Sequence, residues 1–166
     1  REIGVLRRFK VTPLKTLTYI LADLLCYLVV TLVGMLAVVL LGWLIYRVRF
    51  EGQLWAVALG LIYAYLAMAA FGYLLASLAP TARSAQVIGM ALLYPMMFLS
   101  GAGMPIEILP AGLQKFANFL PLTYVVRLLR GLWFGQPWSE LWVPLLVLGV
   151  LLAFCGLLAA RLFRWE

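Results

Sequence analysis

Few side chains in this 166-residue chain could carry out acid–base, nucleophilic or metal chemistry. Histidine is absent, which excludes histidine-based proton transfer and histidine-ligated metal sites. The two cysteines, Cys26 and Cys155, lie inside apolar runs without the spacing of a disulfide framework or a metal site. No Gly-Lys-[Ser/Thr] phosphate-binding sequence occurs at any lysine. We therefore expect no catalytic residue, no metal site and no cofactor bound by this chain.

Asp23 is the one acidic side chain that falls well inside a long apolar stretch. A carboxylate within a membrane span is a candidate functional group that faces the helix bundle or a water-filled cavity. Alternatively, Asp23 lies about two helical turns from the cytoplasmic end of its span and reaches interfacial water or Lys15. The residues alone give equal weight to these two interpretations.

The composition indicates the kind of environment in which these few polar groups must act. Apolar residues make up 66% of the chain and charged residues 11%, and the mean hydropathy is +1.07. A soluble domain has about 45–50% apolar and about 25% charged residues. The composition therefore predicts an all-α integral membrane protein. The net charge of +7 then fits loops that face anionic lipid and cytoplasm better than it fits nucleic acid.

Four stretches are long and apolar enough to cross a bilayer, which needs about 20 residues. These predicted spans are 17–46, 54–79, 87–104 and 141–160, within a single membrane domain 1–166. Basic residues favour the cytoplasmic side. One predicted side holds eight of them: Arg1, Arg7, Arg8, Lys10, Lys15, Arg83, Arg161 and Arg164. The other side holds five: Arg47, Arg49, Lys115, Arg127 and Arg130. We therefore expect both ends of the chain to be cytoplasmic.

The segment 105–137 is apolar but contains four prolines and does not read as a span. Two short helices, about Ala111–Phe119 and Leu122–Phe134, broken at Pro121, fit it best. We expect this pair to lie in the outer leaflet as a re-entrant segment. Arg127 and Arg130 fall on one face of the second helix. They either bind outer-leaflet phosphates or pair with Glu107 or Glu140 to hold the segment, and we favour the second role.

Segment 1–13 has the pattern of a basic amphipathic helix. Val5, Leu6 and Phe9 share a helical face, and Thr12-Pro13 is a typical start signal for the next helix. The residues alone favour a membrane-surface helix over a docking helix for a soluble partner. Further along, Pro95 follows Tyr94 in the middle of the third span, where a kink is expected. A merely structural kink is favoured over a flexing point.

Two motifs resemble those of the type-2 ATP-binding-cassette (ABC) exporter permeases. The first is similar to the segment that couples such permeases to their ATPase and comprises Arg1, Glu2, Gly4, Leu6, Arg7, Arg8, Thr12 and Pro13. The second is similar to the outer re-entrant motif of the family and comprises Ser100, Gly101, Pro105, Glu107, Pro121, Thr123, Tyr124 and Arg130. Members have six spans with the coupling helix between spans two and three. The resemblance therefore implies that the four spans here are spans three to six, and that the N-terminal spans are missing.

The same resemblance implies the permease subunit of an ATP-driven exporter in a bacterial inner membrane. ATP and Mg would be bound by a partner ABC ATPase subunit, which Glu2, Arg7 and Arg8 would contact. The substrate path would lie in a homodimer or between sister permeases, surrounded by membrane lipid and without nucleic acid. Asp23, Tyr94 and Pro95 are candidates for the transport path or its gating. The alternative is a non-transporting membrane anchor or assembly protein, while a membrane-embedded enzyme is disfavoured. No residue pattern identifies the substrate.

Overall fold

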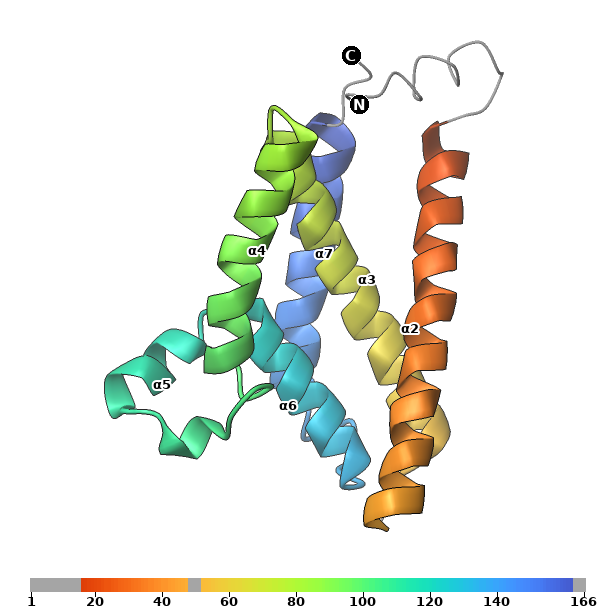
Figure 1. Cartoon of the computed structure of the whole chain (residues 1–166), viewed down its shortest axis with the longest axis vertical. Coiled ribbons are helices and arrows are strands. Elements are labelled where there is room, and N and C mark those ends of the chain that lie inside the picture. The colour runs from red at the N-terminus through yellow and green to blue at the C-terminus, as the bar shows by residue number, and fades with distance from the viewer. Residues whose placement is uncertain (1–15, 48–51, 163–166) are drawn as a thin grey trace. The chain divides into compact units, whose positions relative to one another are not determined.

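The computed structural model describes residues 16–47 and 52–162, and these residues contain helices and connections but no strand (Figure 1). The chain divides into two units, residues 1–51 and residues 52–166, which are described separately here. The described elements are α2 (Thr16–Tyr46), α3 (Leu54–Leu78), α4 (Ala82–Leu99), the 3-10 helix η1 (Ile106–Ile108), α5 (Ala111–Ala117), α6 (Pro121–Trp133) and α7 (Trp142–Leu162). The predicted coupling segment, 1–13, lies outside the described residues.

The first unit is described through a single helix, α2, of 31 residues. At 1.5 Å per residue it is about 46 Å long, which exceeds the roughly 30 Å thickness of a bilayer core. Its stretch Leu21–Ile45 has the composition of a membrane span. The hydroxyl of Thr31 donates to the carbonyl of Tyr27 at 2.8 Å, so the helix satisfies this polar group internally.

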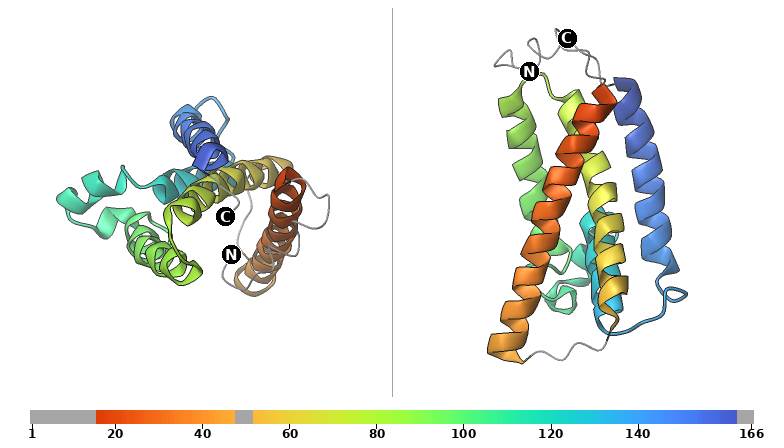
Figure 2. Two further views of the ribbon diagram at one scale, coloured as in Figure 1. Left: turned by 90° about the horizontal axis from the view of Figure 1, so that it is seen from above. Right: turned by 90° about the vertical axis from the view of Figure 1, so that its right-hand side faces the viewer.

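The second unit is built around α3, which packs most extensively on α7 and also against α6 (Figure 2). Small residues on one face of α3 allow this close approach, because they let helix backbones come together without large side chains between them. Ala64 and Ala67 are buried on that face, and a Cβ atom at Gly60 would collide with the Leu132 side chain of α6. By contrast, Gly72 has open space around it among the described residues. Of these two small-residue positions, only Gly60 mediates close packing.

A hydrogen bond also joins α3 to α7. The hydroxyl of Tyr63 donates to the carbonyl of Leu145 at 2.7 Å. It passes directly over Gly149, where an added Cβ would lie 2.6 Å from the tyrosine oxygen. The glycine therefore makes room for the tyrosine hydroxyl to cross between the helices.

Within residues 16–47 and 52–162, four helices have the length and composition to cross a membrane, which confirms the predicted all-α membrane architecture. On α7 a row of exposed apolar side chains lies opposite the buried Leu148 and Cys155. This row consists of Leu146, Val150, Phe154 and Leu157. Water would not tolerate so much exposed apolar surface, whereas lipid would. The protein is an integral membrane protein.

The third span lies upstream of the position that the sequence predicted. Residues 87–104 were expected, whereas α4 runs over Ala82–Leu99. Its start is fixed by a capping box in which Thr81 and Ser84 each accept a backbone N–H of the other, at 3.1 and 3.0 Å. Its end is fixed by Ser100 and by Gly101, which has a positive φ of 89°. An expectation based on apolar runs missed this polar first turn.

The re-entrant segment also differs in detail from its expected pattern. The helices α5 and α6 occur close to the two expected positions, and η1 precedes them. The expected break between the two helices occurs just before Pro121, which is itself the first residue of α6. Proline fits there because the first turn of a helix does not need its missing N–H.

Candidate functional site

The residues of the predicted outer motif gather at one end of the second unit, where α4 ends and α7 begins (Figure 1). η1, α5 and α6 form a hairpin at this end, which we call the re-entrant hairpin (residues 100–134). It packs against α4 through α5 and α6, and against α3 and α7 through α6. The hairpin is therefore attached to every membrane helix of the second unit.

Ser100 and Gly101 form the turn that connects α4 to the hairpin. Ser100 is buried, and its hydroxyl oxygen accepts the N–H of Ala102 at 3.4 Å. The positive φ of Gly101 is a conformation that other residues adopt only with strain. A Cβ placed there would contact Val126 of α6 at 3.8 Å and Ile106 of η1 at 3.9 Å. The turn thus lies against η1 and α6.

Pro105 and Pro110 mark the boundaries of the next two short elements. Pro105 precedes η1 and Pro110 precedes α5, so each proline stands where its fixed φ starts a new helix. The side-chain amide of Gln114 donates to the carbonyl of Leu109 at 2.8 Å and closes the loop between the two elements. Glu107 lies in η1, and its side chain is not among those described.

Three side chains of α6 bind the carboxyl end of α5. The hydroxyl of Thr123, which is fully buried, donates to the carbonyl of Ala117 at 2.6 Å. The hydroxyl of Tyr124 donates to the carbonyl of Asn118 at 2.7 Å. Arg127 donates to the side-chain carbonyl of Asn118 at 2.6 Å. The carbonyl of Ala117 also accepts the N–H of Leu120 at 3.0 Å, so Thr123 adds a second bond to that oxygen. Together the three bonds fasten α6 to the end of α5.

The predicted structural role of Arg127 is supported, but its partner is different. The expected partner was a carboxylate, Glu107 or Glu140, whereas Arg127 binds the carboxamide of Asn118 and lies 5.7 Å from the centre of the Tyr124 ring. A guanidinium over an aromatic face adds a cation–π attraction. Arg127 therefore ties α6 to the end of α5.

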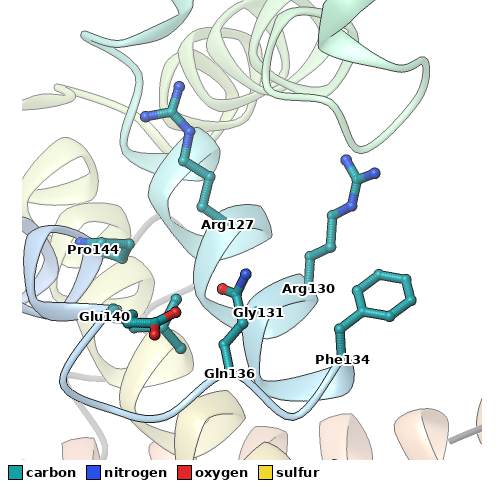
Figure 3. Close-up of a pocket in the computed structure, with 8 residues that line it drawn as sticks. Arg127, Arg130, Gly131, Phe134, Gln136, Glu140 and Pro144 are labelled. Carbon is teal, nitrogen blue, oxygen red and sulfur yellow. The ribbon is translucent and has the colours of Figure 1, made fainter. Parts of the chain in front are cut away.

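A pocket of about 520 Å³ opens beside the carboxyl end of α6 (Figure 3). Its lining comes from α6, from the following loop and from the start of α7, and comprises Arg127, Arg130, Gly131, Phe134, Gln136, Glu140, Leu141 and Pro144. Figure 3 shows the two arginines extending from α6, with Gln136 and Glu140 coming from the loop below them. Gly131 is essential to this shape, because an added Cβ would lie 2.5 Å from Leu141 and 2.7 Å from the amide oxygen of Gln136.

The candidates for the transport path fall in both units. Asp23 lies in the amino-terminal part of α2 and is partly exposed. Tyr94 and Pro95 lie in α4, and the Tyr94 side chain is exposed. Proline lacks an N–H, so the carbonyl of Ala91 in the preceding turn has no helical donor from that position. The roles of these residues in transport stay predictions.

The structure does not describe all of the predicted residues, and it shows others that the sequence did not predict. The coupling residues, Arg1 to Pro13, lie outside the described part of the chain. Within it, sequence reasoning missed Asn118, which receives two of the three bonds across the hairpin. It also missed Thr81 and Ser84, although Ser or Thr followed three residues later by a polar side chain is a recognisable helix start. Nothing in the sequence alone indicated the partner of Asn118.

Long apolar helices packed with a hairpin of short helices make this a helical membrane protein, and comparison with known proteins identifies the family. The sequence profile described as ABC-2 family transporter protein matches residues 1–161. The chain therefore belongs to the ABC-2 transporter family, which confirms the resemblance to type-2 ABC permeases.

Two curated proteins illustrate the relationship. The chain is 27% identical over 169 residues to a probable multidrug ABC transporter permease, YbhR, of Escherichia coli K12, covering 99% of this chain and 45% of that protein. It is 33% identical over 99 residues to nodulation protein J of Rhizobium leguminosarum bv. viciae, covering 60% of this chain and 38% of that protein. The chain thus matches less than half the length of these relatives. Comparison with solved structures gave no significant match.

Proposed function

We propose that this chain forms part of the permease subunit of an ATP-driven exporter. The observation that supports this most directly is the family match over residues 1–161, which includes both the coupling segment and the re-entrant hairpin. The match to the Escherichia coli permease covers 99% of the chain. A membrane anchor without transport activity would share the composition, but it would need neither element.

Energy for transport would come from a separate ABC ATPase that binds ATP and Mg. The 166 residues contain no phosphate-binding loop, so we assign ATP hydrolysis to a partner subunit. We assign the contact with that partner to segment 1–13, with Glu2, Arg7 and Arg8 as its charged groups. This segment would lie on the cytoplasmic side, as would both ends of the chain, in a bacterial inner membrane.

A movement that starts at the contact with the ATPase would then reach the re-entrant hairpin through α4. The Ser100–Gly101 turn joins α4 directly to the hairpin, and Val126 and Ile106 pack around that turn. A tilt of α4, which carries Tyr94 and Pro95, would therefore displace the hairpin. The path itself would form between two permease copies, as a homodimer or with a sister subunit, with Asp23 as a candidate lining group.

The proposal is tested by co-purification of the full-length protein with its ATPase. The double charge reversal Glu2→Arg with Arg7→Glu should abolish co-purification and ATP-driven transport. Arg83→Glu is the matched control, because Arg83 is an exposed basic residue on the same predicted side but outside the coupling segment. If the double variant still co-purifies, segment 1–13 is not the coupling site. If no ATPase co-purifies with the unaltered protein, the ATP-driven mechanism is wrong.

The first substrate class to assay is amphipathic drugs, because the relative that covers nearly the whole chain is named a probable multidrug permease. Proteoliposomes holding the full-length protein and its ATPase should move a lipophilic fluorescent dye only when ATP is present. Transport that is unchanged without ATP would contradict the proposal.

A further inference from the structure

The pocket beside α6 has an apolar floor and a polar rim. Gly131, Leu141 and Pro144 are buried and form the floor. The five rim residues are exposed: Arg127, Arg130, Phe134, Gln136 and Glu140. A volume of about 520 Å³ lies within the range of about 300–1,000 Å³ that is usual for small-molecule sites. The pocket is therefore large enough for a lipid head group and its glycerol.

The two arginines suit a phosphate. Guanidinium groups match the geometry of phosphate oxygens and keep their charge at any physiological pH. Arg127 is already positioned by Asn118 and by the Tyr124 ring. Asn118 accepts from one terminal nitrogen, and a guanidinium carries five N–H donors, so Arg127 has further donors for a ligand.

Glu140 narrows the choice of ligand. A carboxylate in the same pocket as two arginines would repel a diphosphate or another polyanion. It would instead attract a ligand that carries a positive group next to its phosphate. The side chain of Gln136, between the two charged sets in Figure 3, can donate to a phosphate and accept from an ammonium. A phosphodiester linked to a primary amine meets all of these requirements.

The position of the pocket favours a bilayer lipid over a soluble molecule. The pocket lies at the start of α7, a helix long and apolar enough to span the membrane. Its first residue, Trp142, is 61% exposed, and exposed tryptophans concentrate at the membrane–water interface. Phe134, on the rim, and the apolar floor would contact the glycerol and the first methylene groups.

We propose that this pocket, formed by Arg127, Arg130, Gln136 and Glu140, binds the phosphoethanolamine head group of a bilayer phospholipid. The arginines hold the phosphodiester, and Glu140 accepts from the ammonium. The bound lipid holds the carboxyl end of α6 at the depth of the head groups. This inference does not depend on the proposed export function or on the ATPase.

Lipid binding to the full-length protein in detergent tests the proposal, with native mass spectrometry as the readout. Phosphatidylethanolamine should bind about tenfold more tightly than phosphatidylglycerol, because one charge-assisted hydrogen bond is worth about that factor. Glu140→Gln should remove this preference and leave phosphatidylglycerol binding undiminished. Arg130→Gln should weaken the binding of both lipids.

Lys115→Gln is the matched control, because Lys115 is an exposed basic residue of the hairpin that does not line the pocket. It should leave both affinities unchanged. Equal binding of the two lipids, or a Glu140→Gln variant that keeps the preference, would overturn the proposal. Soluble O-phosphoethanolamine binding as tightly as the lipid would also overturn it, since the acyl-linked glycerol would then contribute nothing. Failure of the ATPase to co-purify would leave these affinities as they are.

Discussion

Two regions of the second unit hold their helices together by different means. Where α3, α6 and α7 meet, small and branched apolar side chains are buried, and Ala67, Leu128 and Leu148 are completely so. At the junction of α5 and α6, three polar side chains bind the end of a short helix. The first region depends on shape, and the second depends on directional bonds.

The difference follows from what surrounds each region. In an apolar bilayer there is little hydrophobic force between helices, so long spans associate through close packing of small residues. A seven-residue helix such as α5 has too few internal bonds to be stable alone. Side chains of the neighbouring helix α6 therefore hold its carboxyl end through hydrogen bonds. Substitutions should therefore act through volume in one region and through hydrogen bonding in the other.

The largest effect is expected where volume is added to the packed region. Gly60→Val places atoms where the Leu132 side chain lies, and Leu132 is 2% exposed and has little room to move. We expect a loss of about 3 kcal/mol in the free energy of unfolding. Thermal or denaturant unfolding of the purified protein in detergent measures it.

Gly72→Val is the matched control for this change. Gly72 lies on the same helix with open space around it among the described residues, so both variants share the same cost of a branched residue. An equal loss in the two variants would mean that helix propensity, and not packing on α6, determines the effect.

The next largest effect is expected at the hairpin junction. Thr123→Val keeps the volume of a fully buried side chain but leaves the carbonyl of Ala117 without its 2.6 Å partner. The carbonyl keeps the N–H of Leu120 at 3.0 Å, so only one of its two hydrogen bonds is lost, and we expect a loss of about 1 kcal/mol in the free energy of unfolding. Hydrogen exchange of α5 should rise before that of α3 or α7. Thr123→Ser, which retains the hydroxyl, should restore most of the stability, and a Ser variant as unstable as the Val variant would contradict this role of the bond.

The sequence predicts the membrane spans better than it predicts where each helix begins and ends. The spans were predictable, because about 20 apolar residues in a row leave few alternatives to a membrane helix. The start of α4 was not, because its first turn, Ala82-Arg83-Ser84, is polar and only the capping pair with Thr81 defines it. Apolarity locates a helix within the membrane, whereas its ends depend on local hydrogen bonds.

The candidate site shows the same limit. Pro121, Thr123 and Tyr124 were identified by their resemblance to a family motif, and they lie in the first turn of α6. Asn118 was not identified, since its importance depends on which side chains fold back onto it. The pocket was missed as well, because Gly131, Gln136 and Glu140 come together only through the loop between α6 and α7.

A smaller effect is expected from the one directional bond within the packed region. Tyr63→Phe removes the hydroxyl that donates to Leu145 and keeps the ring. Hydrogen bonds between membrane helices average about 0.6 kcal/mol, so we expect a loss of that size in the free energy of unfolding. Gly149→Ala, whose Cβ would meet the same hydroxyl, should be better tolerated in the Phe background than alone. Strictly additive effects in the double variant would show that the two residues do not contact each other in the membrane.

The smallest effect is expected where the hairpin bond is exposed. Tyr124→Phe removes the donor to the Asn118 carbonyl, but the ring that faces Arg127 remains, and water or lipid head groups can replace the lost hydroxyl. We expect a loss of less than about 0.5 kcal/mol in unfolding free energy, well below that of Thr123→Val. The Thr123 and Tyr124 bonds both join α6 to the end of α5, but only the first is buried. The ratio of the two losses in unfolding free energy therefore measures how much burial strengthens such a bond. A Tyr124→Phe variant as unstable as Thr123→Val would show that water and lipid head groups do not replace the exposed hydroxyl.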